Sequence, residues 1–152
     1  MQSDIKSQYA RLTSVVRQLD ELYHEAAEKM GLSDSASMIM YGLCEAARPC
    51  TQKELCDRWG LNKQTVNSAV KKLSEQGILK ITPSSYSLRE KLIYFTEKGE
   101  LFASETVAKI MRAERTAFGK FSEEERKTAL ALSEKQLRFM REEFSKLDGE
   151  NK

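Results

Sequence analysis

The chain contains few of the residues that interrupt regular structure or build metal and disulfide frameworks. Its 152 residues include 7 glycines, 2 prolines, 3 cysteines and 1 histidine. So little Gly and Pro argues against a disordered or fibrous chain and favours a compact, helix-rich one. Three cysteines, with no CxxC pair among them, do not form a disulfide framework and indicate a reducing compartment. The single histidine, His24, excludes most zinc sites.

The sequence also lacks the features of membrane proteins, secreted proteins and common enzymes. It has no apolar run of about 18 residues and no charged-then-apolar N-terminus with a cleavage site. We therefore expect a cytoplasmic protein with no membrane partner. No glycine-rich phosphate loop, GxSxG motif or metal-spaced acidic cluster is present. We therefore expect no enzymatic activity, metal site or cofactor.

Charge is nearly balanced overall but uneven along the chain. The 25 basic and 23 acidic residues give a net charge of +2. Between Arg48 and Lys98 there are 10 basic and 5 acidic residues, so this segment carries +5 and the remainder −3. A basic centre between mildly acidic flanks suggests a module that faces a polyanion, although a solvated surface can produce so small an imbalance.

Near the N-terminus, apolar residues alternate at spacings of four and three. They are Ile5, Tyr9, Leu12, Val16, Leu19, Tyr23, Ala26 and Met30. This is a heptad pattern over more than three repeats, followed by Gly31. A helix of this length, about 40 Å, exceeds the core of a small domain. We therefore expect part of the pattern to contact a second copy of the chain.

Three helices are predicted in the centre of the chain. The first runs from about residue 35 to 46 and is broken at Arg48 and Pro49. The second begins with the capping box of residues 51–54, in which Thr51 and Glu54 satisfy each other's backbone amides, and it ends at Gly60. Leu55, Cys56 and Trp59 are expected on its inner face.

Asn62 is the predicted cap of the third of these helices, which ends at Gly77. Its core residues are spaced as one helical face: Val66, Ala69, Val70 and Leu73. The runs Ile78–Thr82 and Lys91–Thr96 are rich in β-branched and aromatic residues, and a polar loop separates them. They predict a β-hairpin.

Beyond the hairpin the sequence predicts two more helices. The first begins at Thr96 or Glu97 and runs through Phe118. The second opens with a capping box at residues 122–125 and carries the dimerisation candidates Leu137, Met140, Phe144 and Leu147. Their spacing of 3, 4 and 3 resembles a packing seam. Ile5, Tyr9, Leu12, Val16 and Leu19 complete this candidate set.

Helix, three-residue turn, helix and hairpin follow one another as in a winged helix-turn-helix module. The second of these two helices, which follows Asn62, has no acidic residue on the face opposite its core residues. It carries Lys63, Gln64, Thr65, Asn67, Ser68, Lys71 and Lys72. Gln and Asn can pair with adenine, Ser and Thr with any base, and Lys with phosphate or guanine. We predict base reading by this face, with a merely solvated face as the alternative, and add Lys53 and Lys91 to the DNA-binding candidates.

Three stretches resemble the MarR family of transcriptional regulators: Thr51–Val66, Lys72–Leu79 and Phe95–Leu101. The resemblance implies a mainly α fold with a small β-hairpin wing, double-stranded DNA as partner and a homodimer. It implies a winged module over 35–98 and a helical dimerisation region over 1–32 and 99–148. In that family a wing arginine enters the minor groove, and Arg89 keeps its spacing. Ser87 stands where the family has the aspartate that orients this arginine.

The resemblance further implies a repressor that a small-molecule effector releases from DNA, with an effector and pocket that the sequence does not identify. Two alternatives stay open. A winged helix can serve as a protein-binding adaptor, which predicts an apolar or acidic recognition face. The other alternative is a thiol-based redox sensor that uses Cys44, Cys50 or Cys56. Of these three we expect Cys50 to be the most exposed thiol.

Overall fold

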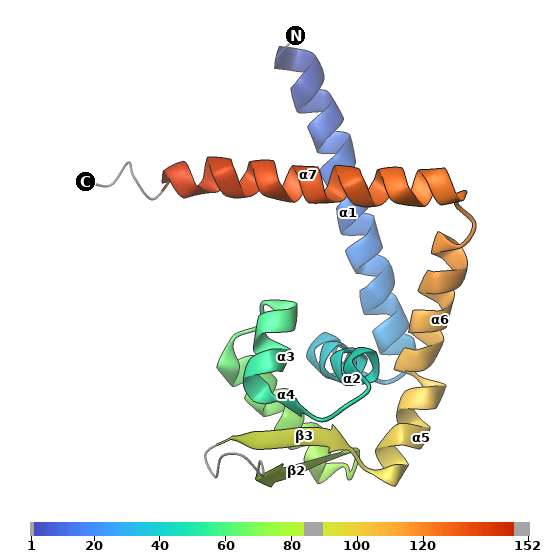
Figure 1. Cartoon of the computed structure of the whole chain (residues 1–152). Helices are drawn as coiled ribbons and strands as arrows, with labels where there is room; N and C mark the ends of the chain where they lie inside the picture. The colour runs from blue at the N-terminus through green and yellow to red at the C-terminus, as the bar shows by residue number, and fades with distance from the viewer. Residues whose placement is uncertain (1, 84–89, 148–152) are drawn as a thin grey trace. The chain divides into compact units, whose positions relative to one another are not determined.

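The computed structural model describes residues 2–83 and 90–147, with side chains from residue 4 onward. Most of these residues are helical, and a small antiparallel sheet completes the fold (Figure 1). The chain forms two compact units, residues 1–111 and 112–152. Within the described residues, no helix is both long enough and apolar enough to cross a membrane.

Two helices open the first unit. Helix α1 spans Gln2–Lys29 and helix α2 spans Asp34–Ala46. Between them Gly31 has φ +70°, and the Ser33 hydroxyl caps α2 by accepting the Ala36 amide at 3.2 Å. The two helices pack near this turn, where Ala27 is buried. The remaining apolar side chains of α1, from Ile5 to Tyr23, stay exposed.

The predicted helix-turn-helix is confirmed. Helix α3 spans Gln52–Trp59 and helix α4 spans Lys63–Glu75. Both expected caps are present: the reciprocal Thr51 and Glu54 bonds start α3, and the Asn62 side chain starts α4. Helix α4 packs against α2, α3 and the sheet. Its buried face is the predicted one, with Val66, Ala69, Val70 and Leu73.

The sheet has three strands, where the sequence predicted a two-stranded hairpin. Strand β2 (Leu79–Pro83) pairs with β3 (Lys91–Phe95), and the short β1 (Cys50–Thr51) pairs with the other edge of β3. The strand order is therefore β1-β3-β2. A two-residue strand has no periodicity that a sequence pattern could reveal, which is why β1 was missed.

The core lies where α2, α3, α4 and the sheet meet. Its largest fully buried side chains are Ile39, Met40, Leu55, Leu73, Val66 and Val107. Ile78, Leu79 and Ile93 join this cluster from the β2 and β3 region. One apolar cluster thus fixes the start of the wing against the two helices of the turn.

The helix predicted from residue 96 to Phe118 is two helices. Helix α5 spans Glu97–Glu105 and α6 spans Val107–Phe118, with Thr106 between them at φ −118° and ψ −97°. The buried Thr106 hydroxyl donates to the Phe102 carbonyl at 2.7 Å, and its amide bonds Ala103 instead. A threonine that takes the i−4 carbonyl with its side chain competes with the helical backbone bond, so the single-helix prediction was wrong.

In the second unit, the predicted capping box opens the last helix. The Ser122 amide donates to Glu125 at 2.8 Å, and the Glu125 amide donates to the Ser122 hydroxyl at 3.2 Å. Helix α7 then spans Glu123–Leu147 and has no buried residue. Its seam residues Leu137, Phe144 and Leu147 are exposed, and Met140 is half-buried.

Candidate DNA-binding site

A tight turn holds α3 and α4 in the helix-turn-helix arrangement. Gly60 has φ +61°, which favours glycine, and its amide bonds the Cys56 carbonyl. The Asn62 side chain accepts the Thr65 amide at 2.8 Å. Gln52 adds a hydrogen bond that the sequence did not predict: its Nε2 donates to the Lys63 carbonyl at 3.0 Å. The first turns of both helices are thereby bound to each other.

Helix α4 has two faces of opposite character. Val66, Ala69, Val70 and Leu73 are buried. Six of the seven predicted DNA-binding residues on this helix are exposed, and Thr65 is half-buried. The exposed six are Lys63, Gln64, Asn67, Ser68, Lys71 and Lys72. The structure thus presents the predicted polar side chains together on one surface, with the start of the helix held by its cap.

The charge of this face is positive. Lys71 lies 4.0 Å from Glu75, one turn further along, where the exposed pair is only weakly attractive. Lys63 and Lys72 make no ion pair with any residue in 4–83 or 90–147. Two lysines on this surface are therefore free to meet a phosphate.

The remaining candidates lie on neighbouring elements. Lys53, on α3, is exposed and lies 3.1 Å from Asp57 on the same helix. Lys91, exposed at the start of β3, is opposite Pro83 of β2. Arg89 and Ser87 lie outside the described residues.

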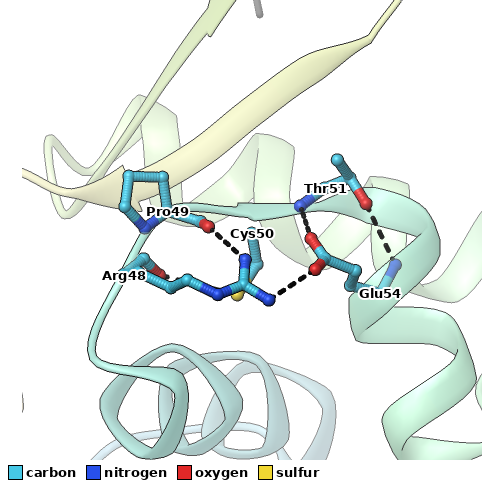
Figure 2. Close-up of polar contacts among 5 residues, drawn as sticks. All are labelled: Arg48, Pro49, Cys50, Thr51 and Glu54. Carbon is cyan, nitrogen blue, oxygen red and sulfur yellow. Dashed lines mark hydrogen bonds and ion pairs between the residues drawn. The ribbon is translucent and has the colours of Figure 1, made fainter.

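Arg48 supports the start of α3 (Figure 2). Its guanidinium donates to Glu54 at 2.6 Å and to the Pro49 carbonyl at 2.9 Å. The other Glu54 oxygen accepts the Thr51 amide at 2.7 Å, so one carboxylate serves both the ion pair and the capping box. The Arg48 and Thr51 bonds lower the pKa of Glu54 to about 2. Sequence reasoning used Arg48 only as a helix end, because the loop that returns it to Glu54 leaves no periodic signal.

Trp59 packs between helices, as predicted. Its ring meets Tyr41 of α2 edge-on, with centroids 5.4 Å apart. Gly42 permits this approach, because a Cβ there would lie 2.9 Å from the Trp59 indole nitrogen. Helices α2 and α3 are therefore in close contact beside the site.

The prediction of an exposed Cys50 was wrong. Cys50 is 2% exposed, because β1 pairs it with Ile93 and directs its side chain into the core. Burial raises its pKa, which lowers the thiolate fraction. Cys44 and Cys56 are half-buried, and burial also raises the pKa of Cys44. No disulfide joins the three.

His24 is a surface histidine that links two helices. Its Nδ1 lies 2.9 Å from an Asp34 carboxylate oxygen at the start of α2. This contact raises the pKa of His24. Across the described part of the chain, no group of three or more His, Cys, Asp or Glu side chains is placed to hold a metal ion.

Residues 30–90, which include the whole helix-turn-helix, match the model of the MarR family. This segment of the chain is similar to the MarR family. Members of this family are transcription regulators. No protein of curated function matches the chain in sequence.

Solved structures have the same fold as this chain over most of their length. NMB1585, a MarR family regulator from Neisseria meningitidis, is 24% identical, with 95% of this chain and 99% of that chain covered and a TM-score of 0.73. CouR from Rhodococcus jostii RHA1, bound to p-coumaroyl-CoA, is 22% identical, covers 85% and 87%, and has a TM-score of 0.67. Bordetella bronchiseptica BpsR, whose DNA binding is regulated by 6-hydroxynicotinic acid, is 15% identical, covers 83% and 98%, and has a TM-score of 0.62.

Proposed function

We propose that this protein is a homodimeric, sequence-specific DNA-binding repressor whose affinity for its operator is lowered by a small-molecule effector. The observation that carries the DNA-binding part is the exposed face of α4. Six polar or basic side chains gather there without an acid among them, opposite a fully apolar buried face. An adaptor surface would be apolar or acidic, so this face favours DNA over a protein partner.

Within that face we assign base reading to Gln64 and Asn67, and phosphate binding to Lys72 with Lys63. Gln and Asn side chains can form two hydrogen bonds to adenine in the major groove. Lysine is a point charge that attracts any phosphate regardless of sequence. Both groups project from a helix whose first turn is fixed by Asn62 and Gln52. A backbone that is already fixed at this turn loses less entropy on binding.

Selection of bound fragments from genomic DNA should first define the operator. On that operator Gln64→Ala should weaken binding by about 1–3 kcal/mol, with little effect on random DNA. Lys72→Ala should weaken both affinities alike. It should also reduce the slope of log K against log salt concentration by about one unit. Lys109→Ala, an exposed lysine of α6, is the matched control and should change neither. Parallel losses in both affinities for Gln64→Ala would contradict the division of roles.

The homodimer is supported by exposed apolar residues that a soluble monomer rarely displays. Ile5, Tyr9, Leu12, Val16 and Leu19 of α1 are 45–63% exposed, and α7 leaves Leu137, Phe144 and Leu147 exposed as well. A twofold dimer would bind a pseudo-palindrome with half-sites about 10 base pairs, or about 34 Å, apart. Leu19→Glu should sediment as a monomer, while Glu21→Lys, elsewhere on α1, should remain a dimer. If the Leu19→Glu variant remains a dimer, these α1 residues do not form the dimer interface.

We assign the wing a supporting contact with DNA. We place Arg89 in the minor groove outside the half-sites, where A·T flanks narrow the groove and concentrate negative potential. Arg89→Ala should then weaken binding most at A·T-flanked operators. Ser87→Asp should strengthen binding at those sites only while Arg89 is present, and a double-mutant cycle at fixed salt measures that coupling. Zero coupling would mean that the two residues act independently.

Effector control rests on similarity to two neighbours of known ligand. The DNA binding of BpsR is regulated by 6-hydroxynicotinic acid, and CouR binds p-coumaroyl-CoA. In this chain an effector would act by binding more tightly to a form of the dimer whose recognition helices misfit the groove. Expression of neighbouring genes with and without the protein would distinguish repression from activation.

A further inference from the structure

The first unit contains an open cavity away from the exposed face of α4. Its volume is about 540 Å³, and it lies between the end of α2, strand β3 and helix α5. Leu43, Ala47, Phe95 and Ala103 supply much of its apolar lining. Cavities that hold small organic molecules have volumes of roughly 300–1,000 Å³ and mostly apolar walls. This cavity meets both conditions.

Two charged side chains line the cavity, and only one of them is already paired. Arg48 donates to Glu54 at 2.6 Å and to the Pro49 carbonyl at 2.9 Å (Figure 2). Glu100, in the first turn of α5, has no ion-pair or hydrogen-bond partner for its carboxylate within the described residues. The charge that remains available to a ligand is therefore negative.

The aromatic side chains strengthen this preference. Tyr94 and Phe95 both line the cavity. The faces of aromatic rings attract cations, while the same rings offer apolar area to the body of a ligand. An anion would instead meet the Glu100 carboxylate, and the charge of Arg48 is already offset by Glu54.

We propose that this cavity binds a cationic amphipathic organic molecule, with its ammonium or amidinium group at Glu100 and its apolar body between Leu43, Ala47 and Ala103. The assignment as a binding site stands on the cavity and its charges alone. The assignment as an effector site rests on the proposed function.

The cavity is positioned to influence the helix-turn-helix. Arg48 and Pro49 form part of its wall and lead directly into β1 and the capping box of α3. Gln52, at the start of α3, holds Lys63 at the start of α4. A ligand that binds better when the Arg48 segment is displaced would shift the start of α3 and, with it, the recognition helix.

The test uses three probes of the same size and opposite or no charge: phenylbutylamine, phenylbutyrate and phenylbutanol. Titration calorimetry with the full chain at low salt should give the amine about fivefold tighter binding than the alcohol, the scale expected of a partly solvated charged contact. Phenylbutyrate should bind more weakly than the alcohol. Equal affinities, tighter binding of phenylbutyrate or no binding of the amine would overturn the proposal.

Variants locate the binding. Glu100→Gln should remove the preference for the amine, whereas Glu97→Gln, an exposed carboxylate of the same helix turn, should preserve it. Ser104→Trp, at an exposed position that lines the cavity, should weaken all three probes. Circular dichroism confirms that each variant is folded. An unchanged amine affinity in Glu100→Gln or Ser104→Trp would place the ligand elsewhere and refute the site.

DNA binding is measured separately, so the two proposals fail separately. If the unliganded wild-type protein binds no operator DNA, the proposed function is wrong. The ligand affinities measured by calorimetry would still test the cavity. Amine at a concentration near its Kd for the wild-type chain should weaken operator binding by the wild-type chain more than by Glu100→Gln. Amine binding that leaves operator affinity unchanged would refute the effector role of the cavity.

Discussion

Gly99 is the position where a single methyl group should have the largest effect on the wing. A Cβ at this residue would lie 1.9 Å from the Ile78 carbonyl oxygen and 3.2 Å from Phe95 Cδ1. Ordinary C···O contacts begin at about 3.3 Å, so the backbone of α5 or of Ile78 must move by more than 1 Å. That carbonyl also accepts the Thr96 amide at 3.0 Å, so the movement strains the bond that joins the end of β3 to the start of β2.

The expected size of the Gly99→Ala effect follows from three contributions. Overpacking costs about 1–3 kcal/mol, and a strained or broken buried hydrogen bond costs about 1–3 kcal/mol more. Alanine's better helix propensity offsets at most about 1 kcal/mol of this. The free energy of unfolding should therefore fall by about 1–6 kcal/mol, which lowers Tm by roughly 2–24 °C.

Urea denaturation followed by circular dichroism, at one protomer concentration for all variants, measures the change. Gly31→Ala is the matched control, because nothing lies within 4 Å of its Cβ and only its φ of +70° is unfavourable. It should cost about 1–2 kcal/mol. A Gly99→Ala variant no less stable than Gly31→Ala would refute the steric argument.

Three further outcomes are expected. Because Arg48 holds the pKa of Glu54 at about 2 in the folded chain, against 4.5 ordinarily, the stability from this carboxylate is present above pH 4.5 and is lost as the pH falls toward 2. Glu54→Gln should flatten the stability profile across that range, and an unchanged profile would contradict the ion pair. In a chain with Cys44→Ser and Cys56→Ser, the buried Cys50 should react with a thiol reagent only as fast as the chain unfolds, and reaction of this folded variant at the rate of a free thiol would show that β1 detaches. Asn62→Ala should cost about 0.5–2 kcal/mol in unfolding free energy through loss of the bond to the Thr65 amide, with Asn62→Asp retaining most of it; equal losses would exclude the cap.

Local signals in the sequence determined most of the helix-turn-helix. The reciprocal cap of Thr51 and Glu54, the Asn62 cap and the positive φ of Gly60 each depend on residues within a few positions of one another. The same holds for α4, whose buried and exposed faces follow from helical periodicity alone. That is why the predicted DNA-binding face of α4 could be named before the fold was known.

Only the tertiary structure decided the features that depend on distant residues. Strand β1 exists because β3 pairs with it, and that pairing buries Cys50, which the sequence placed at the surface. The break at Thr106 arises where a hydroxyl takes a backbone carbonyl in the buried interior, although helical periodicity continues through it. Arg48 meets Glu54, and Glu100 comes to the same cavity as Leu43, because the chain folds back over segments that share no repeat. Periodicity and capping report on neighbours along the chain, whereas pairing, burial and cavities depend on which segments meet in space.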